Sequence, residues 1–132
     1  MHKRTVVRYL DKRKAKGYTA DFLPTNDLFH LSTAAEPGAE SLEVRVTELK
    51  AVLFVKDLVG NPMRPERKEF DPSHPPVGRK IRVVFKDGEV LVGTTPGYDP
   101  ERPGFFVIPA DPESNNERCY VMSAAVKEVS FP

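Results

Sequence analysis

Residues 83–99 read VVFKDGEVLVGTTPGYD, two β-prone runs separated by a Lys-Asp-Gly turn. Apolar residues occupy every second position from Ile81 to Phe85, as expected for a half-buried strand. Gly93 interrupts the second run. A glycine inside a strand permits a sharp bend or a close approach of another backbone. This stretch therefore predicts a hairpin whose second strand is bent.

Segments of the same kind recur along the whole chain. Thirteen prolines are scattered through it and leave few windows long enough for a helix. We therefore expect an all-β protein. The expected strands are residues 4–10, 15–20, 28–32, 42–46, 50–56, 80–86, 89–95, 104–109, 118–123 and 126–131.

The strand pattern of the first half repeats in the second. A shift of 76 residues superposes residues 7–24 on residues 83–100, and the glycine inside the second strand then matches in both copies. After one inserted residue, residues 49–54 match residues 126–131. This self-similarity predicts two tandem copies of a five-stranded unit.

The repeat predicts the domain organisation. Five strands alone are too few for a flat two-layer sandwich, but they can bury an apolar face by bending into a small barrel. We expect one barrel in residues 1–56 and a second in residues 79–132, packed together. Residues 57–78 contain five prolines and no periodicity, so they are expected to form a connector.

Charge is distributed unevenly along the chain. The formal net charge is +1, yet the first 16 residues contain seven Lys or Arg and one acidic residue. The remaining 116 residues contain 13 Lys or Arg and 18 Asp or Glu. The basic end has two interpretations, a face that binds anions or the solvated side of an edge hairpin.

Composition favours a soluble cytoplasmic protein without catalytic activity. The longest apolar stretches are too short to span a bilayer, and the N-terminus has no apolar signal-peptide core. Cys119 is the single cysteine, which suits a reducing compartment. The histidines, His2, His30 and His74, are dispersed, and no Cys/His spacing suits a metal. We expect no enzyme, no cofactor and no metal site.

The stretch from Ile81 to Val107 resembles the first motif of the Sm-like (Sm/Hfq) superfamily, with its apolar strand, Lys-Asp-Gly turn, strand glycine and Gly-Tyr-Asp. Residues 121–131 are similar to the second Sm motif. The resemblance covers residues 80–132 and, more weakly, 4–56, where the first turn contains no glycine. Small SH3-like barrels share this hairpin chemistry. The tandem arrangement also resembles that of uncharacterised bacterial proteins.

The resemblance implies rings that bind single-stranded RNA, here with two units from each chain. Tyr98 and Arg102 would then stack on a base. The sequence departs from the family pattern, because Arg102-Pro103-Gly104 lies near the position of the base-contacting asparagine. The turn at residues 123–125 also offers no basic residue for phosphate contacts.

Arg4 and Arg8 suggest a different ligand. Their spacing resembles that in PilZ domains, which bind cyclic di-GMP, and paired guanidinium groups suit phosphates. The second PilZ motif is absent, since residues 21–26 have neither its serine nor its glycine. Alternating arginines are also common on exposed strand faces.

The sequence thus predicts a non-catalytic binding or regulatory protein of a bacterial cytoplasm. Alternatives are a single-stranded RNA-binding homo-oligomer, a cyclic-dinucleotide receptor and a protein–protein module with exposed edge strands. The candidate nucleic-acid or nucleotide contacts are Arg4, Arg8, Lys12, Arg13, Lys14, Tyr98 and Arg102.

Overall fold

The described residues form ten β-strands, so the prediction of an all-β protein is confirmed. The computed structural model describes residues 2–36, 38–59, 68–70 and 78–132. All ten expected strands are present, with bounds that differ by no more than two residues. They are β1 (Lys3–Tyr9), β2 (Lys14–Thr19), β3 (Leu28–Ser32), β4 (Ser41–Arg45), β5 (Leu49–Val55), β6 (Arg79–Phe85), β7 (Val90–Thr95), β8 (Gly104–Pro109), β9 (Asn116–Met122) and β10 (Val126–Ser130).

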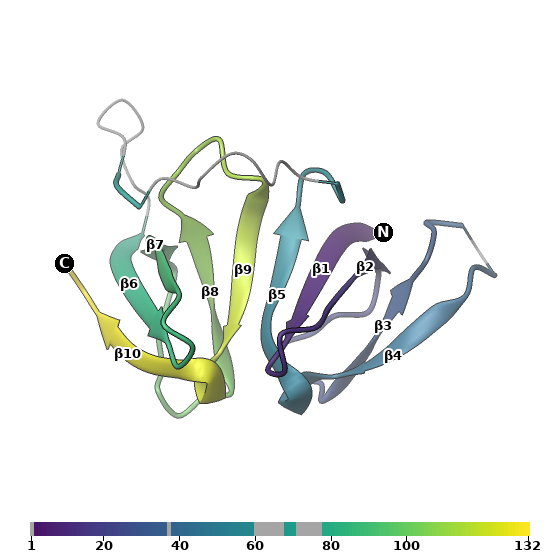
Figure 1. Ribbon diagram of the computed structural model, residues 1–132, viewed down its shortest axis with the longest axis horizontal. Helices are drawn as coiled ribbons and strands as arrows, with labels where there is room; N and C mark the ends of the chain where they lie inside the picture. Colours follow the sequence, from purple (N-terminus) through teal and green to yellow (C-terminus); the bar gives the residue numbers. More distant parts are fainter. Residues whose placement is uncertain (1, 37, 60–67, 71–77) are drawn as a thin grey trace.

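The ten strands form one antiparallel sheet in the order β10-β6-β7-β8-β9-β5-β1-β2-β3-β4. Figure 1 shows two curled halves that meet where β5 and β9 lie side by side. The end strands of each half, β4 and β5 or β9 and β10, are not paired with each other, so the expected closure into two barrels is not confirmed. The reason is the β5–β9 pairing, which joins both halves into one sheet. In the described part of the chain, no helix has the length and hydropathy to cross a bilayer.

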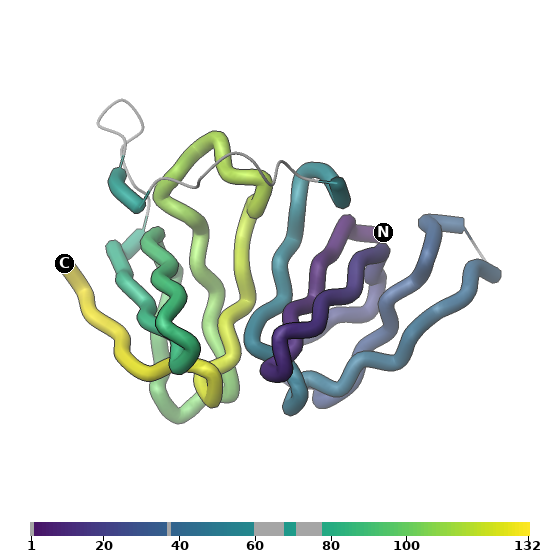
Figure 2. Tube along the Cα trace, in the orientation of Figure 1, coloured from purple at the N-terminus to yellow at the C-terminus, as the bar shows by residue number. Residues whose placement is uncertain are grey.

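Both halves have the same internal order. In each, the fifth strand pairs with the first, and the first four strands pair in sequence. Each fourth strand ends in a short 3-10 helix, η1 (Val46–Glu48) or η2 (Ser123–Ala125). The pairing register also agrees, since Phe29 opposite Val44 corresponds to Phe105 opposite Val121. The tube in Figure 2 follows this path twice from the N-terminus to the C-terminus.

The core consists of two apolar clusters that share the central strands. Cys119 and Val121 of β9 belong to the cluster of the second half, whereas Tyr120 and Met122 belong to that of the first. Leu53 of β5 packs against the cluster of the second half. Each half therefore completes its core with side chains of the other. The expected division into units at residues 1–56 and 79–132 stays a prediction, and most of the 57–78 connector lies outside the described residues.

Gly17 and Gly93 allow a close approach of the next strand. A Cβ atom on Gly17 would overlap the carbonyl oxygen of Ser32, and one on Gly93 would overlap that of Ile108. Both glycines are in the second strand of their half and meet the third strand. A missing side chain is therefore what lets each half curl.

Candidate functional site

A large, mostly apolar cavity lies where the two halves meet. It encloses about 830 Å³ and is called the junction groove here. One wall comes from the end of the β2–β3 loop and from η1, and the other from the β7–β8 loop, β8 and β9. The residues that line it are Pro24, Thr25, Asn26, Asp27, Val46, Thr47, Pro96, Gly97, Tyr98, Asp99, Arg102, Pro103, Gly104, Phe105, Phe106, Tyr120 and Met122.

The floor of the junction groove is apolar and consists of aromatic rings in contact. The rings of Phe106 and Tyr120 meet edge to face with centroids 4.9 Å apart. Phe22 packs against Tyr120 from the first half at 5.3 Å. Met122 is also buried in this cluster. Because strands from both halves fix these side chains, the floor has a defined shape before any ligand arrives.

The rim of the junction groove is polar and slightly acidic. Asp27 and Asp99 contribute two carboxylates, whereas Arg102 is the one cationic residue among those lining the groove. The Arg102 guanidinium lies 3.7 Å from the Asp99 carboxylate and is largely exposed. Prolines border the groove on both walls. An apolar floor with a few polar groups around it is typical of ligand sites.

A second, smaller cleft of about 270 Å³ lies between the β1–β2 turn and the β6–β7 turn, and we call it the ionic cleft. Its core is Lys50, whose side chain is only 6% exposed. The Lys50 ammonium donates to the Asp87 carboxylate at 2.7 Å and also to Glu89. Arg8 donates to Glu89 at 2.6 Å. These ion pairs connect the first half to the second.

The charges of the ionic cleft stabilise one another. The hydrogen bond from Lys50 lowers the pKa of Asp87, and a backbone hydrogen bond from Glu89 adds to this. Partial burial alone would raise the pKa of Glu89, but Lys50 and Arg8 together outweigh it and lower that pKa. Both carboxyl groups are therefore ionised near neutral pH. The ionic cleft acts as a bond between the halves, and three of its cations, Lys50, Arg8 and Arg13, are already paired with carboxylates.

The structure separates the predicted contact residues into different places. Tyr98 and Arg102 both line the junction groove. The Tyr98 ring is half-buried and packs edge to face on Phe105 at 4.9 Å, with Phe131 at 5.6 Å. Tyr98 therefore closes one end of the apolar cluster of the second half. Only the part of its ring that faces the groove can contact a ligand.

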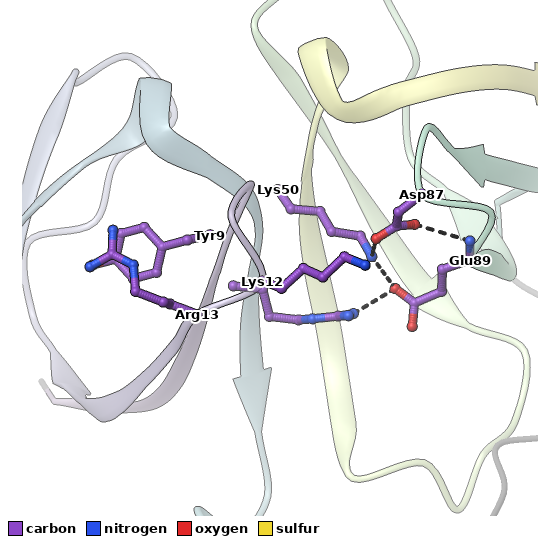
Figure 3. Close-up of a pocket in the computed structure, with 7 residues that line it drawn as sticks. Tyr9, Lys12, Arg13, Lys50, Asp87 and Glu89 are labelled. Carbon is purple, nitrogen blue, oxygen red and sulfur yellow. Dashed lines mark hydrogen bonds and ion pairs between the residues drawn. The ribbon is translucent and has the colours of Figure 1, made fainter.

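Three residues of the basic end, Arg8, Lys12 and Arg13, line the ionic cleft, whereas Arg4 and Lys14 do not. Figure 3 shows Lys12 extending toward Asp87 and Glu89, while Arg13 lies over the Tyr9 ring. The Arg13 guanidinium is 4.7 Å from the centre of that ring, and its Nε atom is 2.6 Å from the Asp11 carboxylate. The exposed Lys14 lies opposite Arg8 in the neighbouring strand.

Arg4 and Arg8 bind different partners at opposite ends of β1. Arg4 donates to the backbone carbonyl of Lys56 at 3.1 Å, whereas Arg8 donates to Glu89. Four residues of strand separate their Cα atoms by about 13 Å. The two guanidinium groups do not form a fork in this arrangement. Cyclic-dinucleotide binding stays a prediction, which a calorimetric titration of Arg4→Ala combined with Arg8→Ala can test.

Sequence reasoning missed the residues that connect the halves. Lys50, Asp87 and Glu89 looked like a strand end and a turn, because their partners lie 37 and 39 residues away. Asn26 and Thr47 of the groove rim occur in segments that carry no motif. The repeat was the one signal in the sequence that could have indicated this cleft, because it places the β1–β2 turn and the β6–β7 turn at the same end of the sheet. Among the residues described, no three His, Cys, Asp or Glu side chains form a metal-binding group.

Comparison with protein families assigns the chain to a family whose function is unknown. A model described as a family of unknown function, DUF6982, matches residues 1–131. The chain belongs to this family. No curated protein and no solved structure matches it.

Proposed function

We propose that the protein is a non-catalytic binding module and that its ligand is a short, extended protein segment held in the junction groove. The observation that carries this proposal is the pre-formed cavity of about 830 Å³ with an apolar aromatic floor. Cavities of this size and lining accept small ligands or a few side chains. Aromatic grooves bordered by prolines and polar residues are also suited to proline-rich segments.

The charge of the rim favours a protein segment over a nucleic acid as the ligand. Two carboxylates face one guanidinium, which is itself paired with Asp99. A nucleic acid would bring phosphates to this acidic rim, and its affinity would rest on cations that the groove does not supply. A segment that combines proline or apolar side chains with a flanking arginine matches both floor and rim.

The shared order and register of the two halves support a finer interpretation of the fold. We infer that the halves are tandem copies of an Sm-like or SH3-like unit. Three of the first-half strands, β1, β2 and β3, begin 76 residues before their counterparts, as the sequence repeat predicts. A crystal structure in which residues 3–55 superpose strand for strand on residues 79–130 would test this inference. A bacterial cytoplasm remains the compartment that we propose.

Fluorescence anisotropy can test the proposed ligand class. The probes are a labelled proline-rich peptide flanked by arginines, the same peptide flanked by glutamates, and a single-stranded oligouridylate. We expect the arginine-flanked peptide to bind most tightly. Thr47→Trp, which places a ring in the groove, should weaken it at least tenfold. Ala35→Trp, at an exposed loop position outside the groove, is the matched control and should leave binding unchanged.

Two results would overturn this proposal. One is peptide binding that is indifferent to flanking charge and to Thr47→Trp. The other is oligouridylate binding that falls steeply with salt and is lost in Tyr98→Ala or Arg102→Ala, which would instead support the RNA-binding alternative.

A further inference from the structure

The junction between the halves depends on a set of side chains that cross it. Phe106, Tyr120 and Met122 of the second half pack into the apolar cluster of the first. Leu53 of the first half packs against the cluster of the second. Together with the β5–β9 pairing, these contacts make the junction an extension of the core.

The repeat identifies the residues of the first half that correspond, at the open β4 edge, to these three residues of the second half. In the shared register, the three residues that cross the junction from the second half correspond to His30, Glu43 and Arg45. All three are exposed. His30 pairs with Asp21 at 2.7 Å, and Arg45 pairs with Glu43 at 3.6 Å. Apolar side chains that complete a neighbouring core are thus replaced by solvated ion pairs.

The open β10 edge also has polar residues at positions where the junction has apolar ones. Its register on β6 repeats that of β5 on β1, including the position of the irregularity. Leu53, which packs against the neighbouring cluster, therefore corresponds to Ser130. Ala51, which is buried at the junction, corresponds to the exposed Glu128.

The ion pairs of the junction are only partly retained at the open edges. The two carboxylates that bind Lys50 have Asp11 and Arg13 at the equivalent positions. Lys127 takes the place of Lys50 in β10. A copy docked through β4 would therefore bring the Arg13 guanidinium, already bound to Asp11, toward Lys127. Two cations would then meet at the position where Lys50 binds Glu89, and the retained carboxylate, Asp11, is already paired with Arg13.

We propose that β4 and β10 are terminating edges, so that the junction forms once inside each chain and is not repeated between copies. Charged residues on an open strand edge are a known means of preventing edge-to-edge pairing. The protein is then a monomer. Because the junction groove takes its two walls from the two halves, each molecule has one groove. The homo-oligomeric ring considered from the sequence would need the opposite behaviour.

Light scattering coupled to size-exclusion chromatography tests the monomer directly. We expect a mass of 14.8 kDa that does not change over a hundredfold range of protein concentration. A mass at a multiple of this value would overturn the proposal. This experiment needs no ligand, so its outcome is independent of the proposed function.

Variants that restore the junction residues test whether these particular side chains terminate the sheet. The first variant rebuilds the β4 edge with Arg13→Glu, His30→Phe, Glu43→Tyr and Arg45→Met. The second rebuilds the β10 edge with Glu128→Ala and Ser130→Leu. Circular dichroism of each variant establishes that it retains its β structure.

Each variant alone, or mixed with the wild-type protein, should keep the mass of a monomer. A mixture of the two variants should form a complex of twice that mass, because a rebuilt β4 edge can pair only with a rebuilt β10 edge. Two folded variants that stay monomeric when mixed would show that these residues do not terminate the sheet, and would overturn the assignment.

Discussion

Gly93 and Gly17 show how a single missing side chain shapes each half. At both positions the carbonyl oxygen of the third strand occupies the space that a Cβ atom would need. Backbone atoms cannot move aside as the end of a flexible side chain can. The strands must therefore separate if either glycine is replaced.

Gly93→Ala should destabilise the protein by about 1–3 kcal/mol, the usual cost of overpacking. The matched control is Gly97→Ala, because a Cβ atom there has no neighbour within 4 Å. Urea denaturation at neutral pH measures both changes in the free energy of unfolding. Equal effects of the two substitutions would contradict the role of close backbone approach.

Lys12 occupies a turn position at which the second half has glycine. Its φ angle is 73°, in the left-handed region, and the equivalent Gly88 has a φ angle of 92°. A non-glycine residue pays about 1 kcal/mol for this conformation. Lys12→Gly should therefore raise the free energy of unfolding by about that amount, as measured by urea denaturation. A destabilised variant would mean that the Lys12 side chain contributes more than its backbone strain costs.

At the scale of elements, the ionic cleft fastens the β6–β7 turn to β5. Lys50→Met should destabilise the protein by about 2 kcal/mol, because it leaves Asp87 without its cation and Glu89 paired with Arg8 alone. Lys127→Met is the matched control at the equivalent, exposed position of β10 and should change stability little. Comparable losses in both variants, measured by thermal or urea unfolding, would argue against the ionic cleft as a link.

The ionic cleft also predicts the response to acid. The pKa values of Asp87 and Glu89 are lower in the folded protein than their ordinary values of 3.8 and 4.5. Their contribution to stability is therefore present above those ordinary values and is lost as pH falls through the folded-state values. Urea midpoints measured from about pH 6 to about pH 3 should fall less steeply in Lys50→Met than in the wild-type protein. Identical slopes would contradict this assignment.

The strands could be predicted from the sequence, and their pairing across the halves could not. Alternation identifies a strand and its buried face locally, as from Ile81 to Phe85. The choice of β9 as the partner of β5 depends on contacts between residues far apart, such as Leu53 and Cys119. Lys50 illustrates the same limit, since its burial makes sense only once Asp87 and Glu89 are beside it.

At the scale of the whole molecule, the two halves share their cores. Tyr120 and Met122 complete the first cluster, and Leu53 packs on the second. Scanning calorimetry should therefore show one unfolding transition with equal calorimetric and van't Hoff enthalpies. Two separate transitions, or a calorimetric enthalpy near twice the van't Hoff value, would mean that each half unfolds alone.

The site could be predicted only in part, because the junction groove forms only when the two halves come together. Tyr98 and Arg102 stood out because they follow a recognisable hairpin, and both line the groove. Asn26 and Thr47 face them only because the halves meet at β5 and β9. Arg4 and Arg8 stood out by spacing, although the fold gives them separate partners.

The most direct test of the central claim is a nuclear magnetic resonance titration of the isotope-labelled protein with the arginine-flanked proline-rich peptide. We predict that backbone amide shifts are confined to the junction groove, including those of Asn26, Thr47 and Phe106. Shifts concentrated instead on residues 8–14 of the basic hairpin, or along β10, would contradict it.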